Sequence, residues 1–135
     1  MDAVMAQSPG TSSVKWKLWL GRAVSALAVA AMTVSAAIKL SHQAQFVDAF
    51  VHKLGYPQGT LTGIGLLELT CVALYAIPRT KILGAVLLTG YLGGAIATHV
   101  RVGEPFVIPL VLGGLAWLGL YLRDERVRAL SPLRA

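Results

Sequence analysis

The chain has 135 residues, of which 56% are hydrophobic and only 13% are charged, with a formal net charge of +6. Soluble domains carry about 25% charged residues, so this composition excludes a water-soluble globule, and its hydrophobicity excludes intrinsic disorder over most of the length. The basic balance does not indicate nucleic-acid binding, because Lys and Arg orient the chain in a membrane protein. We therefore expect one domain whose main partner is the lipid bilayer.

In chain order, the first segment, residues 1–13, mixes small and polar residues without periodicity and is expected to be a mobile tail. Four apolar stretches follow, each near the length of about 20 residues that crosses a bilayer as a helix. They cover residues 18–38, 60–78, 82–100 and 105–122, inside a domain of residues 14–126, and residues 127–135 form a tail. A signal peptide is the alternative for the first stretch, but its long uncharged part favours a retained helix.

The segment between the first two stretches, residues 41–58, has a helical periodicity of its own. Its large apolar side chains recur at helical spacing, with polar ones mostly on the other side. These apolar residues are Phe46, Val47, Phe50, Val51 and Leu54. The pattern predicts a short amphipathic helix lying at the membrane interface in the first outer loop.

The basic residues indicate the orientation of these helices. Nine of them fall on one side of the predicted membrane: Lys15, Lys17, Arg22, Arg79, Lys81, Arg123, Arg126, Arg128 and Arg134. Three fall on the other side: Lys39, Lys53 and Arg101. The positive-inside rule therefore predicts cytoplasmic termini in a membrane of the bacterial inner type.

Every apolar stretch also contains small residues, which let membrane helices approach one another closely. An antiparallel four-helix bundle is the simplest arrangement, because each connection then joins sequence neighbours. We therefore predict an all-α, integral membrane bundle. Gly90 and Gly94 are four residues apart, a spacing that suits either a homo-oligomer contact or packing within the bundle.

Glu68 is the most informative single residue, because it lies near the middle of the second apolar stretch. A carboxylate at mid-membrane costs roughly 2.5–3.5 kcal/mol, so we expect it to face the interior and to be protonated or paired. It serves either as a functional group that handles protons or anchors a ligand, or as a structural hydrogen bond between helices. Candidate partners lie toward the outer side of the membrane: Lys39, Thr98, His99 and Arg101.

Together with Glu104, these residues would line a polar pocket in the outer half of the bundle, the usual form of a ligand site. We predict Lys39, Glu68, Thr98, His99 and Arg101 as ligand-binding residues, with Glu68 and His99 handling protons. A quinone or another lipophilic molecule with a polar head suits such a pocket.

Other kinds of site have weaker support. His42, His52 and His99 lie on the outer side, but no HxxxH or HExxH motif spaces them as ligands, so no metal is predicted. Nucleophile-elbow and phosphate-binding glycine motifs are absent. With Cys71 as its single cysteine, the chain has neither an intramolecular disulfide nor a dithiol redox pair.

The chain resembles the DoxX-like family of small four-helix membrane proteins over residues 20–123. The matching pieces are Lys39–Leu40, Leu54–Pro57, Gly65–Leu69, Ile77–Thr80, Gly84–Ala85 and Gly94–Arg101. The family takes its name from a subunit of a thiosulfate:quinone oxidoreductase, and more distant relatives look like assembly factors for membrane receptors. By motif position, the resemblance implies that the family's polar residues correspond to Lys39, Glu68, Thr98, His99 and Arg101.

Three functions remain open. The first is an accessory subunit that binds a quinone or other lipophilic ligand within a membrane redox system, with a partner subunit as the source of electrons. Here Glu68 would handle a proton, His99 would relay it outward, and Lys39 or Arg101 would hold the head of the ligand. The second is a non-enzymatic assembly or lipid-binding module. The third is a small membrane enzyme that uses Glu68 and His99 as an acid–base pair on a lipophilic metabolite.

Overall fold

The computed structural model describes residues 10–130, and within this range the only regular elements are helices. They are α1 (Gly10–Ser41), α2 (Ala44–Asp48), the π-helical turn η1 (Ala49–Lys53), α3 (Thr60–Ala76), α4 (Lys81–Val102), α5 (Val107–Arg123) and α6 (Glu125–Leu130). The all-α prediction is therefore confirmed. The expected tail of residues 1–13 is wrong for residues 10–13, which are helical, while residues 1–9 and 131–135 lie outside the described residues.

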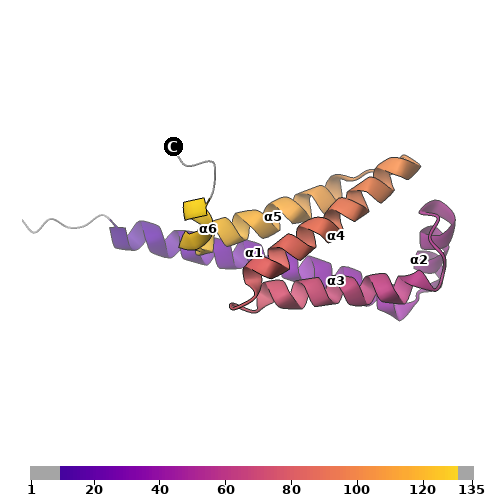
Figure 1. Ribbon diagram of the computed structural model, residues 1–135, viewed down its shortest axis with the longest axis horizontal. Helices are drawn as coiled ribbons and strands as arrows, with labels where there is room; N and C mark the ends of the chain where they lie inside the picture. Colours follow the sequence, from indigo (N-terminus) through magenta and orange to yellow (C-terminus); the bar gives the residue numbers. More distant parts are fainter. Residues whose placement is uncertain (1–9, 131–135) are drawn as a thin grey trace, which may run out of the picture.

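Each of the four long helices contacts two of the others. Helix α1 contacts α3 and α5, and α4 contacts the same two helices. Figure 1 shows α4 and α5 diverging from α1 and α3 toward the end of the molecule that carries α2. At the opposite end, α6 and the α3–α4 turn lie where the long helices converge. We call these the open end and the closed end.

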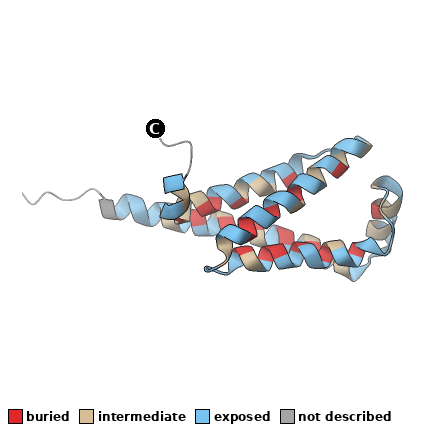
Figure 2. Cartoon of the chain, viewed as in Figure 1, coloured by how far each residue is buried: buried red, intermediate tan, exposed pale blue. Residues whose placement is uncertain are grey.

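The burial pattern is that of a protein surrounded by an apolar solvent. A small core centres on Met32, Tyr75, Leu88 and Leu120, all at most 2% exposed. Each long helix has large apolar side chains that are exposed, among them Leu27, Leu66, Val86 and Ile108. Figure 2 shows in pale blue how exposed residues recur along all four helices. Soluble monomers rarely expose such continuous apolar surface, so these faces require lipid or another protein.

The helix lengths agree with the predicted apolar stretches. Residues Ser12–Ser41 and Lys81–Val102 form helices of 30 and 22 residues that are long and apolar enough to cross a membrane. Helices α3 and α5 are apolar and have 17 residues each. That length lies at the lower limit for a membrane-spanning helix.

Glycines bring the helices together at the closed end. A Cβ on Gly84 would overlap the backbone of Tyr75, so this residue lets α4 lie directly against α3. Likewise, a Cβ on Gly21 would lie 2.9 Å from the carbonyl oxygen of Gly119, where α1 meets α5. Gly90 and Gly94 differ, because a Cβ there would have no atom within 4 Å. Among residues 10–130, their spacing therefore does not bring two helices into contact.

A buried hydrogen-bond chain links three helices near these contacts. The hydroxyl of Tyr75 in α3 donates to the carbonyl oxygen of Ala116 in α5 over 2.7 Å. Because that bond uses the only hydroxyl proton of Tyr75, Ser25 in α1 donates to the Tyr75 oxygen, at 2.9 Å. In an apolar interior these partners satisfy groups that would otherwise be costly to bury.

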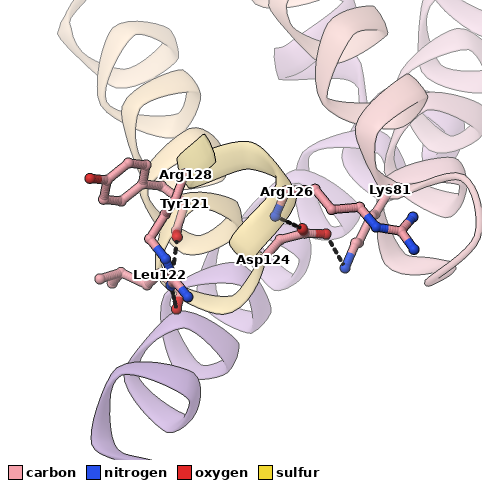
Figure 3. A network of polar contacts seen from close by, with 6 residues as sticks. All are labelled: Lys81, Tyr121, Leu122, Asp124, Arg126 and Arg128. Atoms are coloured by element: carbon pink, nitrogen blue, oxygen red, sulfur yellow. Dashed lines mark hydrogen bonds and ion pairs between the residues drawn. The ribbon is translucent and has the colours of Figure 1, made fainter. Parts of the chain in front are cut away.

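The corner between α5 and α6 fixes the start of α4. Asp124 ends α5, accepts a hydrogen bond from the backbone N–H of Arg126 at 2.9 Å, and forms an ion pair with Lys81 (Figure 3). Arg128 donates to the carbonyl oxygens of Tyr121 and Leu122 and so satisfies the last turn of α5. The hydrogen bond from Lys81 lowers the pKa of Asp124 below its ordinary value.

We expect Gly84→Ala to destabilise the protein by about 1–3 kcal/mol, because the backbone of α3 must move to admit a methyl group. The matched control is Gly93→Ala in the same helix, where a Cβ meets nothing within 4 Å. That control should leave stability unchanged or raise it by up to about 1 kcal/mol through helix propensity. Thermal unfolding in mild detergent measures both, and equal effects would contradict the close α3–α4 contact.

We expect the ion pair of Asp124 to make stability pH-dependent. Because folding lowers the pKa of this carboxyl, its contribution is complete above the unfolded pKa of about 3.9 and is lost as the pH falls through the folded value. Asp124→Asn should lower stability at neutral pH by about 1–3 kcal/mol and reduce the loss on acidification. Asp48→Asn, at an exposed carboxylate, is the control. A wild-type acid profile in Asp124→Asn would contradict this role.

Candidate functional site

The open end of the molecule contains a cavity of about 590 Å³. All four long helices and the segment after α1 contribute to its wall, which is mostly apolar. Its polar and titratable side chains are Ser35, Lys39, Tyr56, Glu68, Tyr91, Thr98 and His99. An apolar wall with a few polar groups is the ordinary composition of a small-molecule site.

The central polar feature of the cavity is an ion pair between α1 and α3. Glu68 is 2% exposed, and its Oε2 lies 2.8 Å from the Nζ of Lys39. Gly65, one turn earlier in α3, makes this approach possible, since a Cβ there would lie 3.1 Å from the side chain of Leu40. Of the candidate partners for Glu68, the structure selects Lys39, and the prediction of a paired, inward-facing carboxylate is confirmed.

The Lys39 ammonium has further neighbours on its own side of the cavity. It donates to the Ser35 hydroxyl over 2.6 Å and lies 5.9 Å from the centre of the Phe46 ring. These two hydrogen bonds, to Ser35 and Glu68, use two of its three N–H donors. No hydrogen bond within residues 10–130 uses the third donor, so Lys39, which lines the cavity, keeps one donor for an oxygen acceptor.

Helix α4 supplies Thr98 and His99 to the same cavity. Thr98 donates to the carbonyl oxygen of Gly94 at 2.9 Å, so the hydroxyl of Tyr56 donates to Thr98, at 2.6 Å. The Nδ1 of His99 lies 2.7 Å from the carbonyl oxygen of Ala95 and must be the donor, because a carbonyl only accepts. In neutral His99, Nε2 is then left as an acceptor.

Residues 44–56, which we call the roof segment, cover this end of the molecule. Residues 44–53 of this segment are helical as predicted, divided between α2 and η1. Its aromatic rings stack in series, with centroids 6.3 Å apart for Phe46 and Phe50 and 4.9 Å apart for Phe50 and Tyr56. All three rings line the cavity, so much of the apolar side predicted to face the membrane surface faces inward instead.

Two residues predicted to line the pocket hold the roof segment in place instead. Arg101 is exposed, does not line the cavity, and donates from Nη2 to the carbonyl oxygen of Leu54 over 2.6 Å. Glu104 forms an ion pair with Lys53, with 3.4 Å between charged atoms. The expectation that Arg101 and Glu104 belong to the cavity wall is therefore wrong, because their side chains turn toward the end of η1.

The outer histidines do not form a metal centre with one another. His42 bonds to Thr62 at 2.9 Å, and His52 lies 3.6 Å from Asp48. Within residues 10–130, no group of three or more His, Cys, Asp or Glu residues could hold a metal ion.

Sequence reasoning missed several residues of the cavity. Ser35 lies four residues before Lys39, so helical spacing already placed the two on one face of α1. Tyr91 lies three residues before Gly94, on the face that leads to Thr98. The inward position of Tyr56 had no sequence signal, because it depends on how the roof segment folds back over α4.

Comparison with known proteins identifies a family that this sequence matches. The sequence model of a family described as the DoxX-like family matches residues 23–119. No curated protein and no solved structure matches the chain. The matched range includes Lys39, Glu68, Thr98 and His99.

We expect Lys39→Met alone to destabilise the protein by about 3–5 kcal/mol, because it leaves the buried Glu68 without its partner. Replacing both residues, in Lys39→Met/Glu68→Leu, should restore most of that loss, since well-packed apolar residues often substitute for a buried pair. Lys53→Met, which removes an exposed ion pair, is the control and should cost at most about 1 kcal/mol. Unfolding in detergent measures the stability of each variant. Additive effects of the two substitutions would contradict an energetic coupling between Lys39 and Glu68.

Proposed function

Since the chain belongs to the DoxX-like family of membrane proteins, we propose that it is a four-helix membrane-spanning module that binds a lipophilic molecule with a polar head in the cavity around Glu68. In this proposal α1, α3, α4 and α5 cross the bilayer in alternating directions. The closed end, which carries Arg79, Arg126 and Arg128, faces the cytoplasm, as the distribution of basic residues favours. The open end faces outward.

The observation that carries this proposal is the Lys39–Glu68 pair, placed in the wall of a cavity that is otherwise mostly apolar. The volume of about 590 Å³ lies in the range of ordinary ligand pockets. Gly90 and Gly94 line it without side chains, which leaves room beside α4. The apolar wall suits a ring or chain, and the ion pair suits one polar head.

The chemistry of the polar groups favours a quinone-type head. The free N–H donor of Lys39 suits a carbonyl oxygen, and the carboxylate of Glu68 suits a hydroxyl proton. His99 supplies an additional acceptor at the α4 side of the same cavity. A quinone carries carbonyls and a quinol carries hydroxyls, so both forms find partners here.

Glu68 and His99 contact the ligand, rather than each other, in this proposal. Both line the cavity, but within residues 10–130 no hydrogen bond joins them. Each can exchange a proton with the head of a bound molecule. Electrons would come from a partner subunit of a membrane redox system, because Cys71 is a lone thiol and forms no dithiol pair.

A second candidate is a non-enzymatic assembly or lipid-binding module. The observation in its favour is that Glu68 already has a partner in Lys39, as a structural interhelical ion pair would require. In that case the exposed apolar faces of the long helices would contact a partner protein, and the cavity would hold ordinary lipid.

Mass spectrometry of small molecules that co-purify with the full chain in mild detergent tests the proposal. We expect a quinone or similar lipophilic compound with the wild type, and about tenfold less with Glu68→Gln and with Lys39→Met/Glu68→Leu. Glu125→Gln, an exposed carboxylate at the closed end, is the matched control and should retain the compound.

The two candidates give different results in this experiment. The double variant separates binding from folding, because it removes the polar anchor without leaving an unpaired charge. Equal amounts of compound in all variants would contradict a role for the ion pair in binding. A wild type without any such compound, together with a protein partner retained by every variant, would favour the assembly module.

A further inference from the structure

A second hollow lies at the closed end, on the far side of the molecule from the cavity. It has a volume of about 470 Å³ and lies between the α3–α4 turn and the α5–α6 corner. Four basic side chains line it, namely Arg79, Lys81, Arg123 and Arg126, against two acidic ones, Asp124 and Glu125. We propose that this hollow binds a phosphate group, carried by the head of an anionic phospholipid or present as free phosphate.

The acidic residues here are already paired. Asp124 accepts the ion pair from Lys81 and the backbone N–H of Arg126, and Figure 3 shows these contacts together at the corner. Glu125 lies 3.8 Å from Arg128, a residue outside the hollow. Each carboxylate therefore has a basic partner, and the four basic residues of the hollow outnumber its two acidic ones.

Three guanidinium groups consequently lack a carboxylate partner within residues 10–130: Arg79, Arg123 and Arg126. Arg123 is held by the ring of Tyr75, 5.3 Å from its guanidinium carbon, and its Nε has no hydrogen-bond partner in the same range. Arg79 and Arg126 are exposed and come from different connections of the fold. Their convergence on one hollow is produced by the fold, not by adjacency in sequence.

Phosphate is the anion that this chemistry fits best. Guanidinium groups present paired N–H donors that match phosphate oxygens, and arginine is accordingly the usual residue for such recognition. The hollow also has an apolar border, since Pro78 and Ile82 line it. That border suits the chains of a lipid, and basic pockets at helix ends commonly hold anionic headgroups.

The test is a thermal-unfolding titration of the full chain in mild detergent. The probes are dioleoyl-phosphatidylglycerol, dioleoyl-phosphatidylcholine and inorganic phosphate. A ligand that binds only the folded state raises the midpoint of unfolding, and above its Kd the stabilisation grows with the logarithm of the ligand concentration. The variant is Arg79→Gln/Arg126→Gln, and the control is Lys15→Gln/Lys17→Gln, which removes the same charge from α1 outside the hollow. All four residues are exposed, so both variants should fold.

We expect phosphatidylglycerol to stabilise the wild type and the control at similar concentrations, and the arginine variant to need about tenfold more. Phosphatidylcholine should have little effect on any of them. If inorganic phosphate stabilises the wild type in the same arginine-dependent way, free phosphate is a ligand of the same site. Arg79→Lys/Arg126→Lys should bind more weakly than the wild type, because lysine keeps the charge but not the paired donors.

Equal weakening in the arginine variant and the Lys15/Lys17 control would overturn the proposal, since it would show attraction by overall charge alone. Absence of stabilisation of the wild type by both phosphatidylglycerol and phosphate would also overturn it. These results are independent of the compound bound in the cavity around Glu68, because none of the altered residues lines that cavity.

Discussion

The buried ion pair of Lys39 and Glu68 is the interaction on which the open end of the molecule depends. A charge in an apolar interior is tolerated only with a partner at hydrogen-bond distance, and here each residue is the other's partner at 2.8 Å. This requirement fixes the register of α1 against α3. The same pair defines the polar point of the cavity, so one contact both sets helix position and supplies the chemistry of the candidate site.

The two ends of the molecule follow from two different packing rules. At the closed end, Gly21, Gly84 and Gly119 remove side chains where helices meet, so backbones come into contact. At the open end the helices diverge. The aromatic rings of the roof segment occupy part of the space between them, and the rest is the cavity. A glycine therefore has opposite consequences in the two places: Gly84 closes a helix contact, whereas Gly90 and Gly94 leave a wall without side chains.

The sequence predicted the helices well because hydrophobic length and period are local properties, and it identified Glu68 because a carboxylate in an apolar run has few physical solutions. It also placed Thr98 and His99 in the pocket through their position near the end of α4. It failed for Arg101 and Glu104, whose partners are Leu54 and Lys53 in the roof segment. Those contacts depend on how a short loop folds back, and a periodic pattern holds no information about that path.

Stability is therefore distributed unevenly between the helices and the roof segment. The roof segment is joined to the α4 end by a hydrogen bond from the exposed Arg101, an exposed ion pair, and the Tyr56–Thr98 bond. Exposed pairs of this kind contribute at most about 1 kcal/mol each, far less than the backbone contacts of the closed end. Local unfolding occurs first in the least stable elements of a fold. The polar contacts that join residues 44–56 to α4 are therefore weaker than the close backbone contact of α3 with α4 that Gly84 allows at the far end.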